Sequence, residues 1–205
     1  MNVNLSTLPL NLADDPLSTD CYSVRLLLEF LQLPYQSVYA DVEQFDNKFE
    51  SPVLLDSSSN ISGLMFIFQY LIELTGTQSQ WIPVYLSSQI QEWHDFNEKL
   101  KLSLGQLRQA SMAMDQFLTD EKRLFKQAAQ QLRELDDHLC EQTICGHRYL
   151  LGGQLTAADL IVFPQVALAW DAGVSLLPFL HIRRWINHIR HQPKFIPMAG
   201  LLAIN

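Results

Sequence analysis

The chain has 205 residues, of which 48% are hydrophobic and 18% charged, and its formal net charge at pH 7 is −8. This composition is typical of a globular protein, and no apolar run reaches the ~18 to 20 residues that a membrane-spanning helix needs. The negative charge disfavours non-specific binding to nucleic acid or anionic lipid. We therefore expect neither nucleic acid nor a membrane as a partner, and the length predicts a two-lobed arrangement.

The first third of the chain alternates strand-like and helical patterns. Four strands are predicted, at 8–13, 35–42 and 51–55 and after the turn at 57–60. Helical spacing of apolar residues predicts a helix over 20–33, which Pro34 ends and which Ser18 can cap. A second helix, 63–74, is apolar almost all round and therefore needs cover on more than one side, for which a second copy of the chain is a candidate.

The chain after about Ser88 is predicted to be helical throughout. Helices are expected at 88–114, 120–141, 157–172 and 178–191. Thr156 and Asp159 have the spacing of a capping box, in which each side chain accepts a hydrogen bond from the backbone N–H of the other residue. Pro164 is expected to kink the helix that follows.

Several motifs are similar to those of the cytosolic glutathione S-transferase superfamily. They are the run Tyr149 to Asp159 (YLLGGQLTAAD), Trp81-Ile82-Pro83 before the helix that contains Trp93, the ending Phe195-Ile196-Pro197-Met198 and the run Pro16 to Arg25. The resemblance covers nearly the whole chain. It implies a thioredoxin-like α/β N-terminal domain (1–76), a linker (77–87) and an all-α C-terminal helical bundle (88–205).

On this resemblance, Ser18 falls on the catalytic serine or cysteine position of the family. A hydroxyl beside a helix N-terminus can donate a hydrogen bond to the sulfur of glutathione, and the helix dipole favours thiolate over thiol. The larger thiolate fraction at neutral pH is the nucleophile. Ser18 also has a purely structural interpretation as an N-cap. Cys21, one turn onward, is interpreted as an ordinary buried thiol.

The resemblance also implies a glutathione site. Ser51 and Pro52 match the family's cis-proline corner, where the residue before proline offers its backbone to the cysteinyl part of glutathione. Gly63 and Leu64 match an acidic residue and a serine that receive the γ-glutamyl end, so this chain lacks both side chains. Losing one hydrogen bond to a charged group costs ~1.5 to 3 kcal/mol, roughly ten- to hundred-fold in affinity. The segment 43–50 is also shorter than the turn, helix and loop found there in the family.

Two functions therefore remain open. The first is transfer of glutathione to a hydrophobic electrophile, with Trp93, Phe96 and Leu100 as a candidate apolar wall, although each of these residues fits a helical core equally well. The second is a non-catalytic binding or regulatory protein on this fold, which acts through protein contacts. Both predict a homodimer through the apolar helix 63–74, and glutathione is the co-substrate that the first implies.

The cysteines and the N-terminal residues indicate the redox chemistry and the location that we expect for this chain. The chain has three cysteines without a CxxC pair, which argues against a disulfide framework and against a cysteine zinc site. The first twelve residues have no basic residue ahead of an apolar stretch and are not expected to be a secretory signal. A cytoplasmic location is expected.

The last predicted helix concentrates histidines and basic residues. His181, His188 and His191 lie near one another, but no carboxylate or cysteine completes a metal site, and none is predicted. The basic residues around them are Arg183, Arg184, Arg190 and Lys194. We interpret these basic residues, and the polar run at 134–138, as solvated helix faces.

Overall fold

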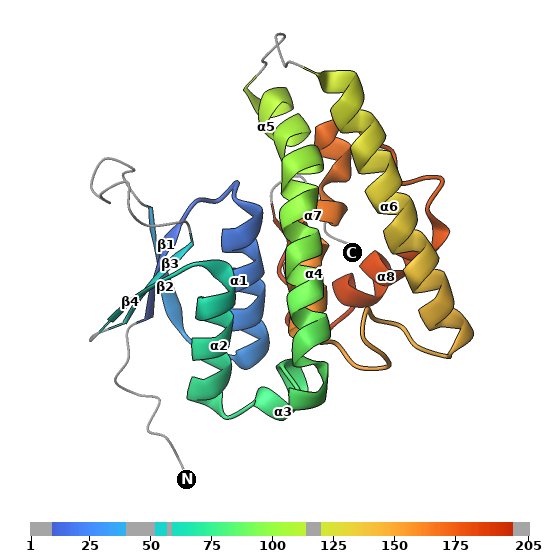
Figure 1. Ribbon diagram of the computed structural model, residues 1–205. Helices are drawn as coiled ribbons and strands as arrows, with labels where there is room; N and C mark the ends of the chain where they lie inside the picture. Colours follow the sequence, from blue (N-terminus) through green and yellow to red (C-terminus); the bar gives the residue numbers. More distant parts are fainter. Residues whose placement is uncertain (1–9, 40–51, 57–58, 114–119, 199–205) are drawn as a thin grey trace. The chain divides into compact units, whose positions relative to one another are not determined.

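The computed structural model describes residues 10–39, 52–56, 59–113 and 120–198, and the chain divides into two units, residues 1–76 and 77–205 (Figure 1). The first unit combines a β-sheet with helices, whereas the described part of the second is helical. The predicted fold class, an α/β thioredoxin-like region followed by an all-α region, is therefore confirmed.

Within its described residues, the first unit contains four strands and two helices. The strands are β1 (Leu10–Asp14), β2 (Tyr35–Tyr39), β3 (Val53–Asp56) and β4 (Ser59–Ser62), and the helices are α1 (Thr19–Leu31) and α2 (Leu64–Thr75). The sheet order is β2-β1-β3-β4. β1 and β2 are parallel, which requires a crossover connection such as α1, while β3 is antiparallel to both of its neighbours.

The core of the first unit forms where α1 and α2 pack together on one face of the sheet (Figure 1). Its fully buried side chains include the paired strand residues Leu12 and Leu54 and the helical residues Leu27, Ile67 and Phe68. Burying a side chain of this size contributes about 1.5 to 3 kcal/mol. The core therefore fixes which face of each helix is turned inward.

Both helices of the first unit end in the left-handed backbone conformation. The C-cap of α1 is Gln32, with φ of 58°, and Pro34 prevents continuation of the helix, as predicted. The C-cap of α2 is Gly76, with φ of 66°, where glycine is favoured. In addition, the hydroxyl of Tyr70 donates a hydrogen bond to the Asp56 carboxylate, which ties α2 to the end of β3. Burial and this hydrogen bond raise the pKa of Tyr70 to about 12.

The described part of the second unit consists of consecutive helical segments. They are α3 (Gln78–Trp81), η2 (Val84–Leu86), α4 (Ser87–Leu100), η3 (Lys101–Gly105), α5 (Gln106–Met112), α6 (Glu121–Ile144), α7 (Ala157–Ala167), η4 (Ala169–Ala172) and α8 (Leu180–Arg190). α4 packs against α7, and α6 packs against α8. The segment expected to be a linker, 77–87, carries two short helical elements, and it belongs to this unit.

The helix predicted at 88–114 is interrupted by a π-helical turn, η3. There the buried Ser103 donates a hydrogen bond to Oε1 of Gln131 on α6. The Gln131 amide in turn donates to the backbone carbonyl of Lys99, 3.2 Å away. A Cβ on Gly105 would lie 2.7 Å from the Gln165 amide nitrogen, so a glycine allows the close approach of α7.

α6 is the longest helix, with 24 residues, and it is amphipathic. Its buried residues are Leu124, Ala128, Leu132, Leu135 and Leu139, which follow one helical stripe. Because the opposite face is polar, α6 lies at the surface of its unit. None of the described helices is long and apolar enough to cross a membrane.

Candidate functional site

Three segments of the first unit meet at one end of its sheet. Ala13 of β1 pairs with Val53 of β3, which in turn pairs with Ser62 of β4. Because β3 runs opposite to its neighbours, the loop after β1, the start of β3 and the end of β4 share this end. We call it the strand-end site. The predicted site residues found on these three segments are Ser18, Pro52, Gly63 and Leu64, while Ser51 lies outside the described residues.

A polar network holds the loop between β1 and α1. The buried carboxylate of Asp14 forms an ion pair with Arg25 of α1 and accepts a hydrogen bond from the Ser37 hydroxyl at 2.9 Å. Arg25 also donates to the backbone carbonyl of Pro16 at 3.3 Å. These contacts fix the path of the chain into α1 and hence the position of Ser18.

Ser18 is the N-cap of α1, so its structural interpretation is confirmed. Its Oγ accepts a hydrogen bond from the backbone N–H of Cys21 at 3.3 Å, and its backbone is extended. A serine hydroxyl can donate while it accepts, so the cap leaves the proton of Ser18 able to bind a ligand. Cys21 is fully buried, with its sulfur 3.9 Å from the carbonyl oxygen of Ala13, and this confirms it as a buried thiol.

Gly63 fixes the start of α2 against β3. Its backbone N–H donates to the carbonyl of Pro52 at 3.0 Å, and its φ is +93°, a region that residues with a side chain rarely adopt. A Cβ there would also lie 3.4 Å from a ring carbon of Phe66. Glycine is therefore the residue that the backbone conformation at this position favours.

The first turn of α2 has no side-chain cap among the described residues, and it contains no acidic residue. Leu64, the first helical residue, is only 5% exposed and belongs to the apolar core. Its side chain therefore supplies no polar group to a ligand, as the sequence indicated. The backbone N–H groups of this turn and the helix dipole still favour an anion such as a carboxylate.

The strand-end site thus combines two helix N-termini of different chemistry. α1 offers a hydroxyl donor beside its positive end, which suits a thiolate, and α2 offers uncapped backbone N–H groups, which suit a carboxylate. A ligand that carries both a thiol and a carboxylate fits this arrangement.

In the second unit, the predicted capping box of Thr156 and Asp159 is confirmed. Asp159 is fully buried and accepts four hydrogen bonds, from the backbone N–H and hydroxyl of Thr156, the backbone N–H of Leu150 and the indole N–H of Trp185. Burial raises the pKa of Asp159, while the four donors act in the opposite direction. The carboxylate therefore joins the start of α7 to the 149–152 loop and to α8.

Comparisons with known proteins agree with this arrangement. Residues 105–193 match the family described as glutathione S-transferase, C-terminal domain. The glutathione S-transferase of Pseudomonas fluorescens superposes with a TM-score of 0.78 at 21% identity, over 94% of this chain and 99% of that one. This chain has the glutathione S-transferase fold. The resemblance expected from the sequence is thereby confirmed for the fold and, within residues 105–193, for the C-terminal domain.

Two further solved structures that superpose on this chain contain glutathione. Ure2p in complex with glutathione superposes with a TM-score of 0.77 at 16% identity, over 91% of this chain and 90% of that one. A glutathione transferase homolog from Lodderomyces elongisporus, with two GSH per subunit, has a TM-score of 0.78 at 16% identity, over 91% and 95%. No curated protein matches this chain in sequence.

Of the three residues expected to form an apolar wall, two line a cavity and the third is buried in the core. Trp93 and Phe96 of α4 line a cavity of about 590 Å³, with ring centroids 5.3 Å apart. Leu100 is fully buried in the helical core, as its alternative interpretation expected. His138 of α6 completes what we call the aromatic cavity, since its ring centroid lies 4.8 Å from that of Trp93.

His138 is a cavity residue that the sequence did not single out, because its run, 134–138, has the charge of a solvated surface. The ring also contacts the backbone, with Nε2 2.8 Å from the carbonyl oxygen of Leu150. Among the described residues, no three histidine, cysteine or acidic side chains are grouped so that they could hold a metal ion.

Proposed function

We propose that this chain binds glutathione at the strand-end site and transfers it to a hydrophobic electrophile. The observation that supports the proposal is Ser18, whose hydroxyl lies at the positive end of α1 and keeps its proton while it caps the helix. The uncapped start of α2 at the same end of the sheet adds a place for a carboxylate.

In the proposed reaction, Ser18 donates a hydrogen bond to the glutathione sulfur. Together with the α1 dipole, this bond lowers the pKa of the thiol, and the proton leaves to solvent. The thiolate then attacks the electrophilic carbon and forms a C–S bond, and the leaving group departs with the electron pair of the broken bond. The backbone at Ser51 and Pro52 is proposed to hold the cysteinyl part.

The proposal includes weak binding of glutathione. The backbone N–H groups of Gly63 and Leu64 are proposed to receive the γ-glutamyl carboxylate without help from a hydroxyl. Because Leu64 is buried and apolar, one charged hydrogen bond is missing, which reduces the affinity by roughly ten- to hundred-fold.

For the electrophile, we propose apolar contacts with Trp93 and Phe96. Their edge-to-face packing leaves both rings on the wall of the aromatic cavity. Leu100, at the end of α4, is buried in the core of the helical unit. We propose that it supports this wall and does not contact the electrophile directly.

Isothermal titration of the chain with reduced glutathione, extended to millimolar ligand, tests the proposal. We expect saturable binding by the wild type and, in Ser18→Ala, a smaller thiolate fraction of bound glutathione, measured by its ultraviolet absorbance. An aryl halide then serves as the electrophile in a conjugation assay. Wild-type binding without any Ser18-dependent conjugation would contradict the transferase function.

A second function, a non-catalytic protein that acts through protein contacts, is favoured by Leu64 and by exposed apolar side chains. Phe66, Val84 and Tyr85 are 67%, 89% and 81% exposed. In this case the wild type does not bind glutathione even at millimolar ligand, whereas Leu64→Ser restores binding. That pair of results would indicate a decayed glutathione site.

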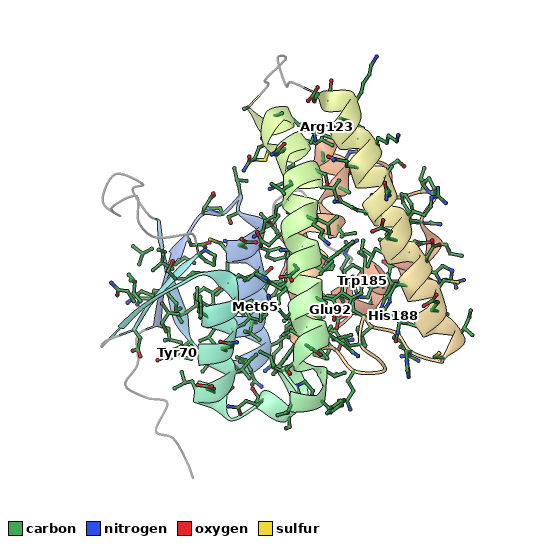
Figure 2. All side chains as sticks on the ribbon, viewed as in Figure 1. Met65, Tyr70, Glu92, Arg123, Trp185 and His188 are labelled. Carbon is green, nitrogen blue, oxygen red and sulfur yellow. The ribbon has the colours of Figure 1, made fainter. Side chains whose placement is uncertain are left out.

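Under both functions we propose a homodimer through α2, in a cytoplasmic location. Phe66 is exposed on this helix, and Met65 and Tyr70 are half-buried on it (Figure 2). Burial of this apolar surface by a second copy would remove it from water. Sedimentation at micromolar concentration should show a dimer that Phe66→Glu weakens. A wild type that is only monomeric would contradict the dimer.

A further inference from the structure

We propose that the helical unit contains a second ligand site, which binds the phosphate group of a small molecule. The site is a cavity of about 420 Å³ formed by the end of α6, the loop that follows and α8. Its basic lining residues are His147, Arg148, His181, Arg184 and His188. We call it the basic cavity, and its function does not depend on glutathione binding.

Two separate parts of the chain bring these side chains together. His181, Arg184 and His188 lie three and then four residues apart on α8, so they share one helical face. His188 and its neighbour Trp185 both project from this helix (Figure 2). His147 and Arg148 come from the turn after α6. In this turn Gly146 has a φ of +79°, and the backbone N–H of His147 donates a hydrogen bond to the carbonyl of Gln142 at 2.8 Å.

The charge of the basic cavity is opposite to that of the whole chain, whose formal net charge is −8. None of the described residues that line it is acidic. Arg148 and Arg184 are exposed and form no ion pair with a described carboxylate. Nδ1 of His181 is buried without a hydrogen-bond partner in the described part of the chain. The cavity therefore holds donors that the described protein leaves unused.

The nearby carboxylate of Asp136 is already engaged at the start of α8. Its Oδ1 accepts hydrogen bonds from the backbone N–H groups of His181 and Ile182, at 2.8 and 2.9 Å. Asp159 is fully buried, and the indole N–H of Trp185 is one of its four donors. These two acidic groups therefore serve backbone and core donors rather than the arginines of the cavity.

The chemistry of the lining favours phosphate over other ligands. Two guanidinium groups and three imidazoles offer more donors than one carboxylate can accept, whereas a phosphate presents three strong acceptor oxygens and up to two charges. Guanidinium groups do not bind metal ions. The remaining wall, which includes Leu139 and Trp185, can contact an apolar organic group, and the volume suits a small phosphate ester.

The basic cavity should bind dianions more tightly as pH falls. Burial lowers the pKa of His188, and the charges of Arg148, His191 and Arg184 lower it further. His147 and His181 line the same cavity. The Tyr149 ring packs against His188, and burial raises the pKa of the Tyr149 hydroxyl. A bound dianion raises the pKa of His188, so binding takes up protons. Sulfate, which stays dianionic, should therefore bind more tightly at lower pH.

Isothermal titration at constant ionic strength, with phenyl phosphate and inorganic phosphate as probes, tests the site. We expect Arg148→Gln and Arg184→Gln each to weaken phosphate binding roughly ten-fold or more, because each removes a charged hydrogen bond. The matched control is Arg183→Gln, an exposed neighbour with the same charge change that does not line the cavity. It should change the dissociation constant less than about two-fold.

The two probes distinguish an ester from free phosphate, since only phenyl phosphate can use the apolar wall. Tighter binding of phenyl phosphate assigns an ester, whereas equal binding assigns phosphate itself. The site is refuted if the wild type shows no saturable binding at millimolar probe, or if Arg183→Gln weakens binding as much as Arg184→Gln. Benzoate binding more tightly than phenyl phosphate would overturn the choice of phosphate. Unchanged melting temperatures verify that the variants are folded.

Discussion

The N-termini of α7 and α2 differ in how their unpaired backbone N–H groups are satisfied. A helix N-terminus leaves several backbone N–H groups without a partner in the helix. At α7, Thr156 and Asp159 satisfy such groups through a capping box that is fully buried. At α2, the N-cap is Gly63, which has no side chain, and the first turn has no acidic residue. One helix start is closed by the protein itself, and the other is left open.

Because of this difference, we expect the α7 start to have a structural role and the α2 start to have a role in ligand binding. At the α7 start the protein supplies both the negative charge and the acceptors, so no ligand is needed. At the α2 start a ligand carboxylate could supply the charge that the sequence omits. The same carboxylate would be redundant at α7. Substitutions at the two starts should therefore affect different measurements, stability at α7 and ligand affinity at α2.

Asp159→Ala should have the largest effect, and it should act on stability alone. The substitution leaves the buried N–H groups of Leu150, Thr156 and Trp185 without acceptors. An unsatisfied buried donor costs about 1 to 3 kcal/mol, so we expect a loss of about 4 kcal/mol in the free energy of unfolding, measured with urea. Glutathione affinity of the folded variant should not change. A loss below about 1 kcal/mol would contradict a structural role for this carboxylate.

Leu64→Ser should affect both measurements. Removing a buried leucine side chain should lower the free energy of unfolding by about 2 to 3 kcal/mol. The new hydroxyl at the start of α2 should nevertheless increase glutathione affinity roughly ten-fold or more. The matched control is Leu64→Ala, which loses a similar apolar volume and gains no hydroxyl. An equal gain in affinity in Leu64→Ala would show that space, and not hydrogen bonding, limits binding.

Asp136→Ala tests a third way of completing a helix start, by a carboxylate from another helix. Asp136 of α6 accepts from two backbone N–H groups at the start of α8, which has no side-chain cap of its own. We expect a loss of about 1 to 2 kcal/mol in the free energy of unfolding. Asp137→Ala is the matched control, because Asp137 is exposed on the same helix. Equal losses in the two variants would contradict the cap.

The features that could be predicted from the sequence are local ones. The helix that begins after Ser18 and the capping box at Thr156 depend on residues within one turn, so their patterns are readable along the chain. The buried Leu64 at the start of α2 follows in the same way from an apolar helical pattern. No such pattern marks the π-helical turn η3, and its hydrogen-bond partner Gln131 belongs to another helix.

The features that could not be predicted join distant residues. Asp136 caps α8 from 45 residues away, and Trp185 donates to Asp159 from 26 residues away. The polar run that contains Asp136 and His138 was interpreted as solvated surface, but its members contact α8 and line the aromatic cavity. Arg148 lines the same cavity as the α8 face, two residues after Gly146, whose φ is +79°. Such contacts depend on packing, which a periodic pattern does not encode.

Ser18→Gly should have the smallest effect on stability and still separate capping from catalysis. Glycine is a good N-cap, so replacing serine by glycine costs only about a few tenths of a kcal/mol, whereas Ser18→Ala costs about 1 kcal/mol. Both variants lose the hydroxyl. If Ser18 donates to the glutathione sulfur, the thiol pKa of bound glutathione, measured by thiolate absorbance across pH, should rise equally in both variants. A rise only in Ser18→Ala would mean that the order of the α1 start, and not the hydroxyl, stabilises the thiolate. The α1 start would then act on a ligand through its dipole and backbone, as we propose for the open start of α2.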